Sequence, residues 1–226
     1  MNRRLVAPPP PAAPARRDDG RGPWLVDGPP ARGAARRGAA RAVPALVLFD
    51  RDGTLVEDVP YNGDPARVRL MPTARDAVAA VRAAGIPLGV VSNQSGVARG
   101  LLTRDQVEAV RRRVDELLGP LHVWAICPHG PGDGCGCRKP APGLVLAACG
   151  RLGVPAARAA VIGDIGADMG AARAAGARGI LVPTPVTRAE EIEAAPAVAP
   201  DLLTAVRLLL SPDPEGGHRP MEVEER

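Results

Sequence analysis

"ALVLFDRDGTL" (residues 45–55) joins a short apolar run to two carboxylates that stand two positions apart. The run at 45–49 predicts a short buried strand, and Asp50 follows it directly. Asp52 comes two positions later, and Gly53 allows a sharp turn, so both carboxylates can face one crevice. Two carboxylates this close repel each other unless a cation lies between them, which indicates Mg²⁺ bound by oxygen ligands.

Apolar runs and helical patterns alternate through the rest of the chain. Four further apolar runs occupy residues 86–91, 121–126, 159–163 and 178–182, and helical spacing of apolar residues appears at 73–85, 103–119, 143–153 and 168–176. Short buried strands that alternate with helices predict an α/β fold, a Rossmann-like parallel sheet with helices on both faces. Right-handed crossovers place the carboxyl ends of the strands at one edge, where open α/β sheets bind their ligands.

A chemically distinctive group follows four of the five predicted strands. These groups are Asp50, Ser92, a cysteine-rich loop that begins at Cys127, and Asp164. Polar residues often follow strands because loops do, so one such ending carries little weight, but four at one edge predict a site. The segment "GDIGAD" (163–168) also offers Asp168 as a further carboxylate.

The stretch "CPHGPGDGCGCRKP" (127–140) concentrates rare residue types. It holds three of the four cysteines, one of the three histidines and the only lysine of the chain. Its spacing offers four soft metal ligands, namely Cys127, His129, Cys135 and Cys137. Three thiolates and an imidazole suit a tetrahedral, structural Zn²⁺. Buried free cysteines are the alternative, but a loop rich in glycine and proline offers no core to bury them in.

A zinc-bound loop would fix the residues that follow it. Arg138 and Lys139 come directly after Cys137, so a braced loop would hold both side chains near the active site. The chain has 28 arginines and this one lysine. A lysine ammonium is a compact point charge that can approach carboxylate and phosphate closely, whereas arginine is a broad fork. Cys149 lies in a helical, apolar stretch and is interpreted as a packing residue.

The basic charge of the chain is confined to its N-terminal arm. The formal net charge is +4, of which residues 1–41 carry +6, so the remainder carries −2. The arm is rich in Pro, Ala, Gly and Arg, which predicts disorder over 1–41, a single domain over 42–210 and a flexible tail over 211–226. Basic residues in an arm do not indicate a nucleic-acid-binding domain. With no apolar run of membrane-spanning length and no signal core, we expect a cytoplasmic monomer.

Four short motifs resemble those of the haloacid-dehalogenase-like phosphatases. In chain order they are "DRDGT" (50–54), "SNQSG" (92–96), "RKP" (138–140) and "GDIGAD" (163–168), and the resemblance covers about residues 43–185. The longer "SNQSGVARG" (92–100) and the cysteine-rich loop resemble the zinc-loop branch of that family. The intervals between motifs are filled by the helices and strands already predicted, so we expect no separate cap domain.

The resemblance implies a role for each motif residue. Asp50 would be the nucleophile that forms an aspartyl-phosphate, and Asp52 would be the general acid and base. Mg²⁺ would be held by Asp50, the Asp52 backbone carbonyl and Asp164. The phosphoryl oxygens and the rest of the substrate would then be bound by Ser92, Lys139, Asn93 and Arg138.

The implied activity is that of a Mg²⁺-dependent phosphomonoesterase acting on a small phosphorylated sugar. The resemblance favours a heptose 1,7-bisphosphate cleaved at C7, with histidinol phosphate or another small sugar phosphate as the alternative. A zinc-loop nucleic-acid-binding module is the rival of another class. That rival leaves three clustered carboxylates unexplained, because they repel a polyanion unless a metal is bound. Val56 and Ile165 depart from the family pattern, which often has an amide residue and a lysine there.

Overall fold

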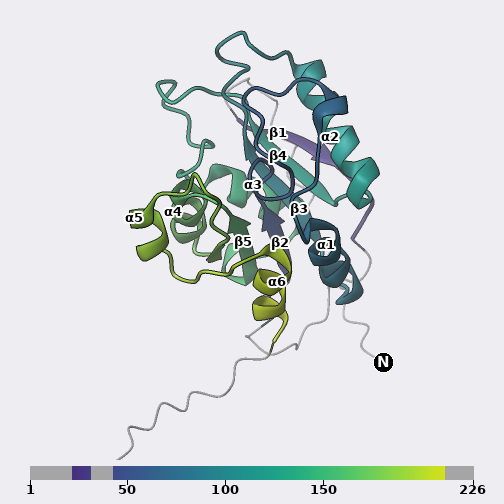
Figure 1. The fold of residues 1–226 in the computed structure, drawn as a ribbon, viewed down its shortest axis with the longest axis vertical. Helices are drawn as coiled ribbons and strands as arrows, with labels where there is room; N and C mark the ends of the chain where they lie inside the picture. The colour runs from purple at the N-terminus through teal and green to yellow at the C-terminus, as the bar shows by residue number, and fades with distance from the viewer. Residues whose placement is uncertain (1–21, 32–42, 212–226) are drawn as a thin grey trace, which may run out of the picture.

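A six-stranded sheet forms the centre of the molecule (Figure 1), in the computed structural model that describes residues 22–31 and 43–211. The strand order is β1-β4-β3-β2-β5-β6. The strands are β1 (Trp24–Asp27), β2 (Leu46–Phe49), β3 (Leu88–Asn93), β4 (Val123–Cys127), β5 (Ala159–Gly163) and β6 (Arg178–Leu181). Strands β2 to β6 run parallel, which confirms the predicted Rossmann-like architecture for this part of the sheet.

Helices cover both faces of the sheet, as predicted. They are α1 (Ala74–Ala83), α2 (Arg104–Leu118), α3 (Gly143–Leu152), α4 (Gly166–Ala175), α5 (Ala189–Glu193) and α6 (Leu202–Leu210), with short 3-10 turns η1 (Pro65–Arg67) and η2 (Ala156–Arg158). The buried side chains of α1, α2 and α6 share one apolar cluster with the sheet. Those of α3 and α4 share a second cluster on the opposite face. The amphipathic stretch of α6 was not among the predicted helices.

Strand β2 occupies the interior of the sheet because its four residues are all apolar. Leu46 to Phe49 are completely buried, and β2 pairs in parallel with β3 on one side and β5 on the other. A strand enclosed in this way is held by pairing on both edges and by packing on both faces. Asp50, directly after it, is therefore attached to a rigid part of the molecule.

The connections between strands are short within residues 43–211. Only η1 and α1 lie between β2 and β3, and only α2 lies between β3 and β4. At these two positions the described chain therefore carries no inserted cap domain, as the motif spacing predicted. None of the helices that the structure describes is both long and apolar enough to cross a membrane.

Strand β1 corrects the prediction of disorder over residues 1–41. Trp24–Asp27 pairs antiparallel with β4, from Trp24 opposite Ile126 to Asp27 opposite Val123, so the sheet is mixed. The strand is four residues long, with alternate side chains half-buried, and its neighbours are glycine and proline. Too few residues carry the pattern to reveal it locally, and its partner lies about 100 positions further along the chain. Residues 1–21 and 32–41 of the predicted arm, and 212–226 of the tail, lie outside the described part.

Removing β1 should lower stability, because it leaves β4 as an unpaired edge and exposes the surface under Trp24. Trp24 packs against the core, and the Arg104 guanidinium lies 4.7 Å from its ring centre. We expect a truncation of residues 1–31 to melt about 4–8 °C below a truncation of residues 1–21, for a loss of about 2 kcal/mol. Calorimetry of both proteins measures the difference. Equal melting temperatures would show that β1 contributes nothing to stability.

Candidate active site

Three carboxylates meet where β2 and β5 end. Asp50 follows β2, Asp164 follows β5, and Asp168 lies in the first turn of α4. One oxygen from each of the three lies within 4.8 Å of the others, and all three residues are buried. The two strand ends are tied together because the Asp50 amide donates to the Ile162 carbonyl at 2.8 Å. The topology thus assembles the carboxylates that the sequence placed at one edge.

A glycine is required beside this cluster. Gly53 has a φ of 75°, and a Cβ at this position would lie 2.2 Å from Oδ2 of Asp164. The same turn is held by backbone bonds from the amides of Leu55 and Val56 to the Arg51 carbonyl, at 2.9 and 3.0 Å. Gly53 therefore lets the turn after β2 fold directly over the Asp164 carboxylate.

Lys139 provides the positive charge inside the cluster. Its Nζ donates to Oδ1 of Asp50 at 2.5 Å, to Oδ1 of Asp168 at 2.6 Å and to the Val91 carbonyl at 2.9 Å. Burial alone would lower the pKa of Lys139, but Asp168 and Asp50 outweigh burial and raise the pKa above its usual value. Lys139 is therefore an ammonium ion, and Asp168, which the sequence offered as a further carboxylate, is its second partner.

One ammonium does not balance the charge of these acids. Burial raises the pKa of Asp50 to about 8 against the attraction of Lys139, and repulsion from Asp168 and Asp164 adds to the rise. Burial, with repulsion from Asp168, also raises the pKa of Asp164 to about 7. The carboxyl groups of Asp50 and Asp164 therefore resist ionisation, because they are buried and because the neighbouring negative charges would repel theirs. A dication such as Mg²⁺ would offset that repulsion, and carboxylate oxygens are the ligands that Mg²⁺ prefers.

Strand β3 adds hydroxyl and amide groups to the same edge. Ser92 is buried, and its Oγ accepts from Nε2 of Gln94 at 2.9 Å. Asn93 is bonded to the backbone of Lys139 twice: its Oδ1 accepts from the amide at 3.0 Å, and its Nδ2 donates to the carbonyl at 3.2 Å. The two hydrogen bonds join the end of β3 to the segment that carries Lys139.

Asp52 is held by side chains that the sequence reasoning did not select. Nε of Arg51 lies 3.0 Å from both carboxylate oxygens, and Nη2 of Arg51 donates to Oδ2 at 2.8 Å. Nε2 of Gln94 donates to the same Oδ2 at 3.0 Å. Both residues lie inside the quoted motifs "DRDGT" and "SNQSG", and their position there was the only available signal.

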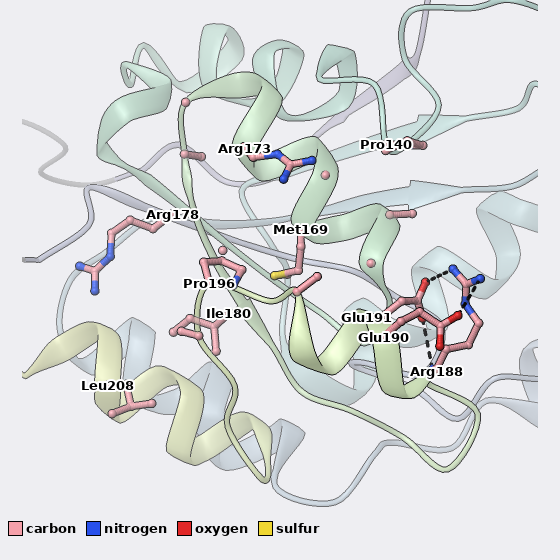
Figure 2. Close-up of a pocket in the computed structure, with 18 of the residues that line it drawn as sticks. Pro140, Met169, Arg173, Arg178, Ile180, Arg188, Glu190, Glu191, Pro196 and Leu208 are labelled. Carbon is pink, nitrogen blue, oxygen red and sulfur yellow. Dashed lines mark hydrogen bonds and ion pairs between the residues drawn. The ribbon is translucent and has the colours of Figure 1, made fainter.

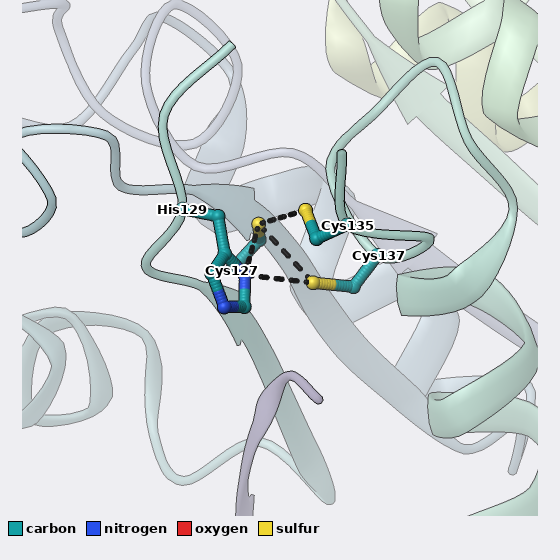
Figure 3. Close-up of side chains that lie close together, drawn as sticks. All are labelled: Cys127, His129, Cys135 and Cys137. Carbon is teal, nitrogen blue, oxygen red and sulfur yellow. Dashed lines mark hydrogen bonds between the residues drawn. The ribbon is translucent and has the colours of Figure 1, made fainter. Parts of the chain in front are cut away.

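Cys127, His129, Cys135 and Cys137 form a compact cluster at the end of β4 (Figure 3). Sγ of Cys127 lies 3.8 Å from Sγ of Cys135, 3.3 Å from Sγ of Cys137 and 3.5 Å from Nδ1 of His129. Ligands at tetrahedral Zn²⁺ would be separated by about 3.5–3.8 Å, given bond lengths of about 2.3 Å to sulfur and 2.0 Å to nitrogen. The hydrogen bond with Cys137, opposed by burial, lowers the pKa of Cys127 to about 5. The same hydrogen bond raises the pKa of Cys137, so it is the ligand set and its spacing that indicate a Zn²⁺ site.

The cluster is linked directly to the carboxylate site. Cys137 precedes Arg138 and Lys139, and Nη1 of Arg138 donates to the His129 carbonyl at 3.3 Å. Arg138, predicted to contact substrate, is thus bonded to the loop itself. At the other end of the loop, the amide of Gly143 donates to the Gly136 carbonyl at 3.0 Å, which joins the loop to α3.

A separate cavity of about 1130 Å³ lies among α4, α5, β6 and α6 (Figure 2). Its lining mixes Arg173 and Arg178 with apolar side chains such as Met169 and Leu208. None of the predicted site residues lines it, although Pro140, next to Lys139, does. The carboxylate cluster and this cavity are therefore different places in the molecule.

Comparisons with known proteins agree with this geometry. Residues 136–206 match a family model described as "HAD-hyrolase-like". The D-glycero-beta-D-manno-heptose-1,7-bisphosphate 7-phosphatase of Mesorhizobium japonicum is 42% identical over 152 residues, covering 62% of this chain and 70% of the relative. Its namesake from Pseudomonas aeruginosa is 35% identical over 145 residues, covering 62% and 82%.

A solved structure shares the fold. The crystal structure of D,D-heptose 1,7-bisphosphate phosphatase from B. bronchiseptica, complexed with magnesium and phosphate, superposes with a TM-score of 0.66 at 30% identity. The match covers 73% of this chain and 97% of that one. By fold, by motif order and by relatives of which it spans more than two thirds, this chain belongs to the haloacid-dehalogenase-like phosphatases, in the family of the D-glycero-beta-D-manno-heptose-1,7-bisphosphate 7-phosphatases.

Proposed function

We propose that this chain is a Mg²⁺-dependent phosphomonoesterase that removes the 7-phosphate of D-glycero-D-manno-heptose 1,7-bisphosphate. The observation that carries the proposal is the carboxylate of Asp50, which is buried at the end of β2 and lies 2.5 Å from the Lys139 ammonium. The substrate comes from the relatives, since two of them are named for this reaction. The cysteine-rich loop beside the carboxylates also resembles the loop of the zinc-loop branch, to which the motifs are similar.

Asp50 and Asp52 share the chemistry. An oxygen of Asp50 attacks phosphorus, the bond from phosphorus to the sugar oxygen breaks, and Asp52 gives its proton to that oxygen. Asp52 then takes a proton from water, whose oxygen attacks phosphorus, and the bond from phosphorus to Asp50 breaks to release phosphate. Mg²⁺, when bound, would be held by Asp50, Asp164 and the Asp52 carbonyl, and it would supply positive charge that offsets the carboxylates and the phosphoryl group.

The remaining residues bind and orient. The Ser92 hydroxyl and the Lys139 ammonium bind phosphoryl oxygens, and Asp168 holds Lys139 in place. Asn93 keeps Lys139 at the site through its two backbone hydrogen bonds, and both Asn93 and Arg138 contact the substrate. Preorganised donors of this kind act most strongly where charge develops during phosphoryl transfer.

Zn²⁺ is proposed as a structural ion on the cysteine-rich loop. Its four ligands would be Cys127, His129, Cys135 and Cys137, which leaves no open position for a reacting group. Although the loop is rich in glycine and proline, Cys127 and Cys137 are buried in the second apolar cluster, so the ion would join the rest of the loop to that packing. Its role is to fix Arg138 and Lys139.

We also propose the extent of the catalytic domain, its oligomeric state, its cellular location and its partner. Residues 42–210, together with β1 (Trp24–Asp27) at the edge of their sheet, are proposed as one catalytic domain that works as a monomer. Three of the four cysteines belong to the proposed zinc cluster, which supports a reducing, cytoplasmic location. The partner is a small phosphorylated sugar, not a nucleic acid or a membrane.

The test is phosphate release across a panel of substrates with Mg²⁺ present. The heptose 1,7-bisphosphate should give the highest kcat/KM and lose only the 7-phosphate. A higher kcat/KM for histidinol phosphate would establish the alternative substrate. Salt-sensitive DNA binding without any phosphate release would favour the nucleic-acid-binding module.

Replacing Lys139 with arginine should lower kcat by about tenfold or more, although the charge is kept. The ammonium sits between Asp50 and Asp168 at 2.5 and 2.6 Å, in a fully buried space that a planar guanidinium cannot fill in the same way. Steady-state kinetics measure the loss. Near-normal kinetics in Lys139→Arg would mean that the position needs only a positive charge.

A further inference from the structure

We propose that Arg51 is a positioning residue, which acts by holding the carboxylate of Asp52 so that Oδ1 of Asp52 transfers the proton. The inference rests on the proposed function, in which Asp52 is the general acid and base. Arg51 meets the carboxylate with two nitrogens: Nη2 lies 2.8 Å from Oδ2, and Nε lies 3.0 Å from each oxygen. A guanidinium that meets a carboxylate in this way fixes both its position and its plane.

Burial makes this pairing persistent. The side chain of Arg51 is only 4% exposed, and that of Asp52 is 24% exposed. A buried guanidinium is costly unless a carboxylate compensates it, and Asp52 is the carboxylate that is hydrogen-bonded to Arg51. The pair therefore restrains Asp52 far more than an exposed ion pair on the surface would.

The backbone explains how two adjacent residues come to face each other. The amides of Leu55 and Val56 both donate to the Arg51 carbonyl, and the amide of Gly53 donates to the Val56 carbonyl at 2.8 Å. With Gly53 at a φ of 75°, the chain reverses just after Asp52. The turn folds the Asp52 side chain back toward the Arg51 guanidinium.

The hydrogen bonds distinguish the two oxygens of Asp52. Oδ2 accepts from Nη2 and Nε of Arg51 and from Nε2 of Gln94, which also donates to Oγ of Ser92. Among the described residues, Oδ1 accepts only from Nε of Arg51. A carboxylate oxygen has two lone pairs, so Oδ1 retains one for the proton while Oδ2 is fully engaged. Gln94 also places this carboxylate two hydrogen bonds away from the hydroxyl proposed to bind the phosphoryl group.

Two esters with different leaving groups test the inference. Departure of a sugar alkoxide needs a general acid, whereas departure of 2,4-dinitrophenolate does not. For Arg51→Met we expect kcat/KM to fall by about tenfold or more with the sugar phosphate, and by no more than a few-fold with 2,4-dinitrophenyl phosphate. Arg113→Met is the matched control, because Arg113 pairs with Glu116 on the exposed side of α2 and should affect neither ester.

A double-mutant cycle separates positioning from a general structural role. In the Asp52→Asn background the acid is already absent, so adding Arg51→Met should cause no further loss with either ester. Arg51→Lys keeps the buried positive charge but lacks the two donor nitrogens of the guanidinium. If Arg51→Met does not fold, Arg51→Lys should still fold. It should lose kcat/KM with the sugar phosphate and not with 2,4-dinitrophenyl phosphate. Thermal melts of all variants establish that the folded protein is being compared.

Two results would overturn the inference. They are an equal loss for both esters in the folded Arg51 variants, and an Arg51 effect that persists in the Asp52→Asn background. In either case the wild-type chain would still release phosphate, so the proposed function would stand. If the wild-type chain hydrolyses neither ester with Mg²⁺ present, the proposed function fails and the inference fails with it.

Discussion

Asp50→Asn is expected to abolish turnover, with a loss in kcat/KM on the order of 10⁴-fold or more, while the protein stays folded. An amide cannot attack phosphorus, so no aspartyl-phosphate can form. The fold should survive because the amide is nearly the same size and removes one of the mutually repelling buried carboxylates. Lys139 keeps Asp168 as its charged partner at 2.6 Å.

Three measurements check this result. Phosphate release and thermal melting separate a chemical defect from unfolding, and Asp105→Asn, an exposed acid at the start of α2, serves as the control. Rapid acid quenching of the wild-type enzyme followed by mass spectrometry should find a phosphoryl group on the peptide that contains Asp50. Appreciable Mg²⁺-dependent turnover by Asp50→Asn would eliminate the covalent mechanism.

Cys135→Ser is expected to lose bound zinc and about a hundredfold in rate, although Cys135 contacts no reacting atom. Its Sγ is one of the four clustered ligand atoms, and without it the loop that leads to Lys139 is no longer fixed. A misplacement of about 1 Å at a reacting group is enough for a loss of this size. The wild-type protein should carry about one zinc per chain in elemental analysis.

Cys149→Ala is the matched control for that experiment. Cys149 is buried in α3 outside the cluster, and burial raises the pKa of its thiol to about 11, so this variant should keep its zinc. Circular dichroism of Cys135→Ser should resemble the wild type, because Cys135 lies outside the strands of the sheet. Added Mg²⁺ should not restore activity, since a hard cation binds thiolates poorly. A wild-type enzyme that is zinc-free after chelation and fully active with Mg²⁺ would disprove the bracing role.

The sequence predicted the parts of the fold in which local pattern and tertiary environment agree. The run at 159–163 coincides with β5, and the four residues of β2 lie inside the predicted run at 45–49. Completely buried parallel strands are apolar at every position, so even short ones stand out from their flanks. The sequence predicted that the carboxylates of Asp50 and Asp164 lie close together, because parallel strands joined by right-handed crossovers end at the same edge of the sheet.

The features that the sequence could not predict are a strand and side-chain hydrogen bonds that depend on contacts between residues far apart in the chain. Strand β1 exists because β4 offers it an edge, and nothing in its four residues specifies that partner. The bonds from Gln94 to Asp52, and from Lys139 to Asp168, join side chains 42 and 29 positions apart. Asp168 was noticed as a carboxylate, yet its partner could be identified only after α4 was placed against the segment that carries Lys139.

During synthesis on the ribosome, β2 emerges well before the strand that completes its pairing. Leu48 pairs with Gly89 of β3 on one side, but its partner on the other side is Val161 of β5. Closing so long a loop is entropically costly, which makes this parallel pairing a late and slow event in folding. The same event brings the Ile162 carbonyl to the amide of Asp50. A nascent chain that has not yet exposed β5 therefore contains Asp50 but not Asp164 or Asp168, so the cluster of three carboxylates cannot form.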